Sequence, residues 1–225
     1  MSTLQENKHP DTEALFTHME KEFFYLAHQK KVLELGPFQG WYTQLLLNQN
    51  PKSITGIETS PGSVKDLKTK FHSEPRVEIQ HADMFDYLNA DSPNFDLVVA
   101  CGVIYHTPAP ILLLEKIVNF ANPEDIIIDA PGSKLIKRKN EWNGYLESKF
   151  GSPGYRQALG YRQSGWVSII PTGAITEILE GYGYILQKRS FVGDFNVFSK
   201  EHSVVLHYHL KIPSKLKIIW EKIRG

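Results

Sequence analysis

Two acidic residues and two glycines lie near the start of the chain at positions where they could hold a nucleotide. Glu34 lies two residues before Gly36 in the segment VLELGPFQGWYT, Gly40 follows, and Glu58 ends the next apolar segment. A glycine turn between a strand and a helix brings backbone N–H groups to a ligand, and an acid at the end of the next strand can accept hydrogen bonds from ribose hydroxyls. The alternatives are a plain tight turn and a solvated strand end.

The glycine pattern indicates which nucleotide this turn excludes. The dinucleotide motif G-x-G-x-x-G would need glycines where this chain has Phe38 and Trp41. These bulky side chains would keep the backbone away from a pyrophosphate. The Gly-Lys-Ser/Thr of a P-loop does not follow either. We therefore expect a cofactor without a pyrophosphate.

Further candidates follow the next two apolar segments. Asp83, in QHADMFD, could face an adenine amino group or cap the following turn. Cys101 could be a nucleophile, but the sequence shows no activating group, so we expect a small residue that lines the pocket. His106, preceded by Tyr105, lies where α/β sheets place ligands and is a candidate base. The alternative is a packing histidine just before a helix.

Three other features carry weaker predictions. His207 and His209 alternate, so they share one face of a strand; a metal pair is an alternative, but we expect a plain surface and no metal site. The basic run Lys134–Lys139 is either a solvated loop or a grip on an anionic substrate. Large aromatic residues near it favour a substrate lid over core packing. They are Trp142, Tyr145, Tyr155, Tyr161 and Trp166.

The elements that must position these residues follow from the alternation of short apolar and amphipathic segments, which is typical of an α/β fold. Segment 131–170 has little apolar periodicity, so we expect it to be an insertion. The last two strands are predicted to form a hairpin. The expected strands are 32–35, 53–58, 77–80, 95–100, 125–130, 184–191 and 204–210, and the expected helices are 11–29, 41–48, 61–71, 109–119 and 171–181.

Taken in order, the motifs between about residues 31 and 130 resemble those of the class I S-adenosylmethionine-dependent methyltransferases. ELGPFQG resembles the first motif of that family, E/D-x-G-x-G-x-G, and GIETS resembles the segment with its ribose-binding acid. QHADMFD is similar to the segment that contacts adenine, and FDLVVACGVIYH to the fourth-strand motif. The departure is Phe38 at the middle glycine, with Pro37 before it.

The resemblance implies a seven-stranded, mostly parallel sheet with an antiparallel last strand and helices on both faces. It implies S-adenosyl-L-methionine as cofactor and S-adenosyl-L-homocysteine as product. His106 would be the base, and Tyr105 would orient the acceptor. The implied cofactor-contacting residues are Glu34, Gly36, Pro37, Phe38, Gly40, Glu58, Thr59, Ala82, Asp83, Met84, Cys101 and Gly102.

Composition limits the remaining possibilities. The 225 residues suit a single domain, 1–225, with a leading helical segment 1–30 and a substrate insertion or lid 131–170. The formal net charge of +0 argues against a broad nucleic-acid surface but leaves room for a small basic patch. One cysteine fits a reducing compartment, and no apolar run approaches the about 20 residues of a membrane span. We expect a cytoplasmic protein.

The acceptor is the least determined feature. We expect O- or N-methylation of a small molecule such as a sugar or a secondary metabolite. Two alternatives stay open. GVIYHTPAP and YRQSGWVSIIPTGAITEILEGYGY also resemble bacterial enzymes that modify the wobble uridine of tRNA with a carboxylated form of the same cofactor. The second alternative is a non-catalytic module that binds the cofactor. The sequence leaves the acceptor atom and the oligomeric state open.

Overall fold

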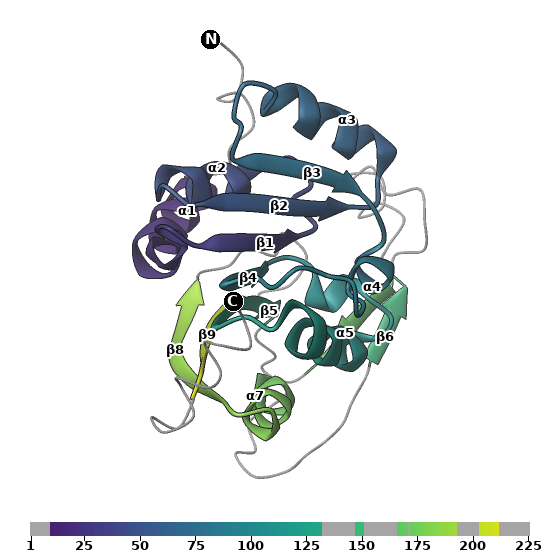
Figure 1. Cartoon of the computed structure of the whole chain (residues 1–225). Coiled ribbons are helices and arrows are strands. Elements are labelled where there is room, and N and C mark those ends of the chain that lie inside the picture. Colours follow the sequence, from purple (N-terminus) through teal and green to yellow (C-terminus); the bar gives the residue numbers. More distant parts are fainter. Residues whose placement is uncertain (1–9, 132–146, 151–165, 171, 193–202, 212–225) are drawn as a thin grey trace.

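The computed structural model describes residues 10–131, 147–150, 166–170, 172–192 and 203–211. In this part of the chain, seven strands form one sheet in the order β3-β2-β1-β4-β5-β9-β8 (Figure 1). The first five strands are parallel, whereas β9 pairs antiparallel with both β5 and β8. The predicted fold class is confirmed. The strands are β1 (Lys31–Leu35), β2 (Ser53–Glu58), β3 (Val77–His81), β4 (Leu97–Ala100), β5 (Asp125–Pro131), β8 (Tyr184–Val192) and β9 (Ser203–Leu210).

The helices lie close to the predicted segments, with two differences. The expected helix 11–29 is divided, because both Phe23 and Phe24 are fully buried and a tighter turn brings these consecutive side chains into one core. The expected helix 109–119 ends in a π turn that Asn122 terminates with a φ of 44°. The helices are α1 (Pro10–Glu22), α2 (Trp41–Asn48), α3 (Pro61–Lys70), α4 (Met84–Tyr87), α5 (Pro110–Lys116), α7 (Thr172–Gly181), the 3₁₀ helices η1 (Phe24–Ala27) and η2 (Ile104–His106), and the π turn η3 (Ile117–Ala121).

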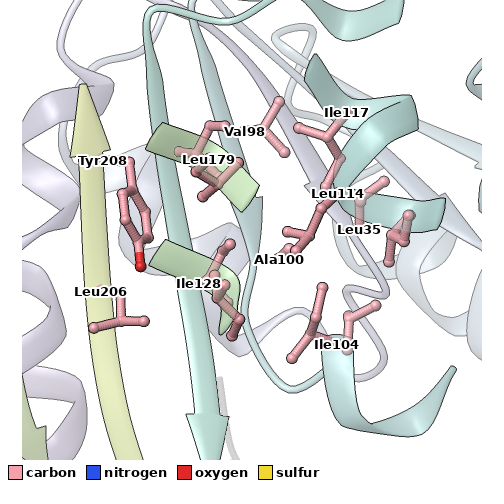
Figure 2. Packing of buried hydrophobic residues seen from close by; sticks show 14 of the residues in the cluster. Leu35, Val98, Ala100, Ile104, Leu114, Ile117, Ile128, Leu179, Leu206 and Tyr208 are labelled. Atoms are coloured by element: carbon pink, nitrogen blue, oxygen red, sulfur yellow. The ribbon is translucent and has the colours of Figure 1, made fainter. Parts of the chain in front are cut away.

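The sheet has a separate apolar core on each face, because successive residues of a strand point to opposite sides. On one face, Val98 and Ala100 of β4 pack with side chains from α5 and α7 (Figure 2). On the other face, Val99 and Cys101 pack with side chains from α1, η1, α2 and α3. The glycine turn after β1 therefore follows a strand of a sheet that helices cover on both faces.

The expected insertion 131–170 contains a small two-stranded antiparallel sheet, formed by β6 (Glu147–Phe150) and β7 (Trp166–Ile169). The backbone of β7 lies beside η2. The basic run Lys134–Lys139 and the predicted lid aromatics Trp142, Tyr145, Tyr155 and Tyr161 lie outside the described residues. The role of this segment as a lid therefore stays a prediction.

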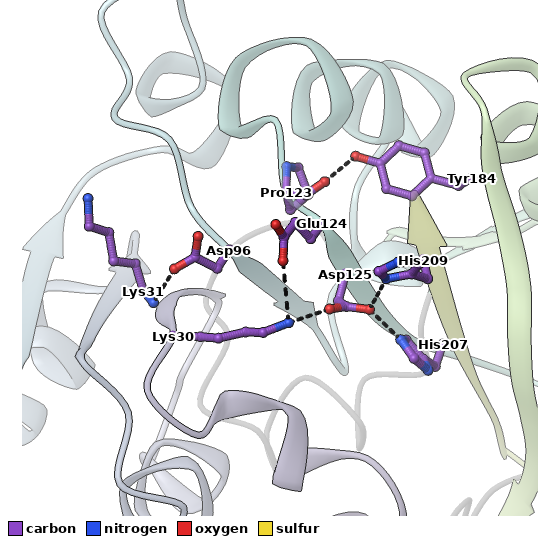
Figure 3. Close-up of polar contacts among 9 residues, drawn as sticks. All are labelled: Lys30, Lys31, Asp96, Pro123, Glu124, Asp125, Tyr184, His207 and His209. Carbon is purple, nitrogen blue, oxygen red and sulfur yellow. Dashed lines mark hydrogen bonds and ion pairs between the residues drawn. The ribbon is translucent and has the colours of Figure 1, made fainter. Parts of the chain in front are cut away.

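The predicted surface position of His207 is wrong. His207 is only 7% exposed, and its ring nitrogen lies 2.7 Å from Asp125 Oδ1. His209 lies 2.9 Å from the same oxygen, and Lys30 donates to Oδ2 (Figure 3). The reason is the antiparallel pairing of β5 with β9, which places Asp125 directly opposite His209. The carboxylate partner of His207 thus comes from 82 residues earlier in the chain.

The described residues contain neither a candidate metal site nor a candidate membrane-spanning helix. No group of side chains there is arranged to hold a metal ion, the Asp125 group included. No helix in that part of the chain is both long and apolar enough to cross a membrane.

Candidate functional site

The predicted site residues come together at one edge of the sheet. Strands β1 to β5 are parallel, so their carboxyl ends meet at the same edge. Figure 1 shows β1, β2 and β3 side by side with their arrowheads on one side. The glycine turn follows β1, Glu58 ends β2, Asp83 follows β3, and Tyr105 and His106 follow β4.

The glycine turn has a backbone that glycine favours at three positions. Gly36, Phe38 and Gly40 have φ values of 65°, 52° and 72°. Phe38 therefore keeps the left-handed conformation of the glycine it replaces, at a strain of about 1–2 kcal/mol. A Cβ at Gly36 would lie 2.8 Å from Val103 Cγ2, and one at Gly40 would lie 2.7 Å from Phe71 Cε2. The two outer glycines are thus also required by packing.

Glu58 joins the turns that follow β1 and β2. Its Oε2 accepts the backbone N–H of Phe38 at 3.1 Å, and its Oε1 accepts that of Ser60 at 2.8 Å. The side chain is buried at 5% exposure, so the alternative of a solvated strand end is wrong. A carboxylate has about four lone-pair sites, so two are left for other donors.

Glu34 lies in β1, directly before the glycine turn. It is buried, and Thr43 Oγ1 of α2 donates to its Oε2 at 2.7 Å. Burial raises the pKa of Glu34 to about 7, although the Thr43 hydrogen bond and the charge of Lys70 lower it. Lys70 Nζ also donates to the backbone oxygens of Gln39 and Gly40. Lys70 therefore holds the backbone of the turn, and Glu34 is joined to α2, the helix that follows the turn.

Asp83 caps α4. Its Oδ1 accepts the backbone N–H of Phe85 at 2.7 Å, so the capping alternative describes the structure. The residue is exposed, and its contact with adenine stays a prediction. Ala82 donates its backbone N–H to the Glu58 carbonyl, and the Thr59 carbonyl lies 3.1 Å from His81 Nε2. Met84 begins α4 and is half-buried.

Cys101 and Gly102 continue β4 into η2. Burial raises the pKa of the Cys101 thiol well above its ordinary value, so the thiol is neutral and unsuited to be a nucleophile. Gly102 has a φ of 74°, and the atom nearest to a Cβ there would be Tyr105 Oη, at 3.8 Å. A side chain at this position would therefore be in ordinary van der Waals contact with Tyr105, and the positive φ is what favours glycine there.

Tyr105 and His106 lie in η2 with their ring centroids 4.4 Å apart. Burial lowers the pKa of His106 to about 4, below the ordinary value of about 6.5 on which its role as a base relied. His106 is therefore neutral at pH 7, and it is a weak proton acceptor. His106 ends η2 and α5 begins at Pro110, so its position also suits the alternative of a histidine shortly before a helix.

Two residues at this edge were not singled out from the sequence. Asp129 lies near the carboxyl end of β5, and burial raises its pKa to about 7. Its Oδ1 is buried and has no hydrogen-bond partner among the described residues. Tyr42 of α2 is half-buried, and its removal from solvent raises the pKa of its hydroxyl. The signal for Asp129 was an acid inside the apolar segment DIIIDA.

A surface hollow elsewhere has no part in this site. It lies along α3, and none of the predicted site residues lines it. Its lining consists of Pro61, Val64, Lys65, Lys68, Thr69 and His72.

Known proteins share both the sequence core and the fold. Residues 33–128 match a family model described as a methyltransferase domain. The chain is 30% identical over 109 residues to a tRNA U34 carboxymethyltransferase of Nautilia profundicola, covering 44% of this chain and 34% of that protein. The chain thus spans about a third of the length of this curated relative.

Two solved structures show the same fold at low identity. The N-terminal domain of EvdMO1, in the presence of SAH and D-fucose, has a TM-score of 0.63 and 19% identity, covering 91% of this chain and 85% of that chain. The N-methyltransferase NodS from Bradyrhizobium japonicum, in complex with SAH, has a TM-score of 0.64 and 13% identity, covering 92% and 90%.

The family match begins in β1 and ends in β5, so it includes the turns that follow β1, β2, β3 and β4. Residues 33–128 therefore match a methyltransferase domain, and the described fold is that of solved structures that include an N-methyltransferase in complex with SAH.

Proposed function

We propose that this chain transfers the methyl group of S-adenosylmethionine to an oxygen or nitrogen of a small-molecule acceptor. The observation that carries the proposal is the Glu58 carboxylate. It is buried and already held by two backbone N–H groups, so it is fixed in place with two lone-pair sites left. A fixed carboxylate at the end of β2 suits the two hydroxyls of a ribose.

The other residues of the edge also fit this cofactor. Phe38 keeps the left-handed backbone conformation between the two outer glycines of the turn, and Gly102 has a positive φ at the end of β4. Glu58 would hold the ribose, and the second carboxylate oxygen of Asp83 would accept a hydrogen bond from the adenine amino group. When bound, the cofactor supplies a methyl group on a positively charged sulfur, which is a good leaving group. The protein then needs only to align the acceptor and take up its proton.

The acceptor side is formed by η2 and its neighbours. Both β5 and the backbone of β7 lie beside η2, which carries Tyr105 and His106. In this proposal Tyr105 orients the acceptor, and segment 131–170 sets the specificity. His106 and Asp129 are the two candidate proton acceptors.

A small-molecule acceptor is favoured by the net charge of the chain. The formal net charge is +0, so the chain lacks the general excess of Lys and Arg with which proteins bind tRNA. D-fucose in the related EvdMO1 structure is compatible with a sugar acceptor. The alternative of a tRNA acceptor is favoured by the name of the Nautilia relative.

The test is transfer of an isotope-labelled methyl group from S-adenosylmethionine to two pools, a small-molecule extract and total tRNA. We expect label in the small-molecule pool that depends on the protein. Label in the tRNA alone would establish the alternative acceptor. Binding of S-adenosylhomocysteine without label in either pool would favour a non-catalytic binding module.

A further inference from the structure

Asp129 lies near the carboxyl end of β5, at the edge of the sheet that carries the predicted site residues. Residues 125, 127 and 129 of β5 point to the same face of the sheet, and Ile127 packs in the core that also contains Cys101. The register pairs Ala100 with Ile128, so Cys101 and Asp129 are neighbours where β4 and β5 end. The backbone of Asp129 makes a hydrogen bond to the Cys101 sulfur.

A comparison with Asp125, on the same face of the same strand, shows what is unusual about Asp129. Asp125 has three partners, Lys30, His207 and His209, and they hold its pKa well below the ordinary range although burial raises it (Figure 3). Asp129 Oδ1 is equally shielded from solvent but has no partner among the described residues. A buried acceptor without a donor costs about 1–3 kcal/mol, so an external donor would relieve a real penalty.

The other titratable groups at this edge are poorer proton acceptors. Burial lowers the pKa of His106 to about 4, and burial raises the pKa values of Cys101 and Tyr42 so that both stay neutral. Burial also raises the pKa of Glu34 to about 7, but that group is 2% exposed and already accepts a hydrogen bond from Thr43. Burial brings the pKa of Asp129 to about 7 as well, near the pH at which a general base works best.

We propose that Asp129 is the catalytic base of the acceptor site: it accepts a hydrogen bond from an O–H or N–H group of the acceptor and takes that proton. This inference rests on the proposed function. As the acceptor atom bonds to the methyl carbon, the carbon–sulfur bond breaks and its electron pair goes to the sulfur. The proton goes to the Asp129 carboxylate. The acceptor must therefore be a neutral hydroxyl or amine.

The test uses a pair of probes that needs no acceptor. S-adenosylhomocysteine has no group at the transfer position, whereas sinefungin carries a primary amine there in place of the methyl. Calorimetry on the wild type, on Asp129→Asn and on Asp66→Asn compares the two affinities. Asp66 is an exposed acid of α3 and is the matched control.

We expect Asp129→Asn to weaken sinefungin binding by about tenfold or more, because it removes a charge-assisted hydrogen bond. Binding of S-adenosylhomocysteine should change by less than about twofold, and Asp66→Asn should change neither affinity. Unchanged sinefungin binding, or an equal loss for both probes, would overturn the role of Asp129. A wild type that binds neither probe would instead overturn the proposed function.

A measurement on the wild type keeps the test independent of whether Asp129→Asn folds. Sinefungin affinity should rise several-fold from pH 6 to pH 8, as the Asp129 carboxyl ionises, while that of S-adenosylhomocysteine stays flat. Glu34 titrates in the same range, so Glu34→Gln is the control and should keep the rise. A flat sinefungin profile, or a rise that Glu34→Gln abolishes, would contradict the proposal.

Discussion

At the scale of single residues, four acids of one sheet differ through their partners. Glu58 is held by two backbone N–H groups, Glu34 by a threonine, and Asp125 by two histidines and a lysine. Asp129 Oδ1 has no partner in the described part of the chain. Residue type alone therefore does not fix the role of an acid here, because the partners determine its protonation and its free lone pairs.

Substitution of Glu58 tests the cofactor side. In Glu58→Ala, two backbone N–H groups lose their acceptor, and the ribose hydroxyls lose theirs. Each charge-assisted bond is worth about 1.5–3 kcal/mol, so binding of S-adenosylhomocysteine should weaken at least about tenfold. Calorimetry measures this, with the exposed Glu78→Ala of β3 as control. An unchanged dissociation constant for Glu58→Ala would remove Glu58 from the cofactor site.

Substitution of His106 and Asp129 separates the two candidate bases. Loss of a general base costs about 10²–10⁴ in rate. With an acceptor found in the labelling screen, Asp129→Asn should lose turnover in that range, and His106→Gln should lose less than about tenfold. Both variants should keep their affinity for S-adenosylhomocysteine. The reverse order of the two turnover numbers would assign the proton to His106, as the sequence first suggested.

At the scale of elements, the turn after β1 shows how packing and backbone conformation constrain one position. Gly40→Ala would place a Cβ 2.7 Å from Phe71 at a φ of 72°. We expect it to destabilise the fold by about 1–3 kcal/mol. Gly62→Ala in α3 meets no atom closer than 3.9 Å and should stabilise by about 0.5–1 kcal/mol. Urea unfolding of both variants checks this, and equal stabilities would contradict it.

The contact between β5 and β9 predicts a pH dependence of stability. Burial raises the pKa of Asp125, but hydrogen bonds from His207 and Lys30 outweigh it, so the folded pKa is well below the unfolded value of about 3.9. A lowered folded pKa stabilises the protein above about pH 4, and this stabilisation is lost as the pH falls below that value.

Asp125→Asn should therefore reduce the free energy of unfolding by about 1–3 kcal/mol at pH 7 and by much less at pH 2. Urea unfolding at the two pH values measures the difference, and Asp66→Asn serves as the exposed control. An equal loss at both pH values would show that the charge of Asp125 does not stabilise the pairing of β5 with β9.

At the scale of the whole molecule, local sequence patterns predicted the helices and strands well. They did not predict contacts between residues that lie far apart in the sequence. Helix 41–48 and strand 53–58 have the predicted bounds, because a repeating apolar pattern is a local property. The burial of His207 depends on Asp125, which β-sheet pairing brings from a distant part of the chain. The role of Asp129 was missed for the same reason, since its environment is formed by β4 and α2 rather than by its sequence neighbours.

We expect this fold to bind S-adenosylmethionine through the turn after β1, which should exclude a pyrophosphate. Calorimetric titration of the protein with S-adenosylhomocysteine and, separately, with NAD tests it most directly. We expect a dissociation constant on the order of micromolar for S-adenosylhomocysteine, corresponding to about −8 kcal/mol, and negligible binding of NAD. Tighter binding of NAD than of S-adenosylhomocysteine would contradict it.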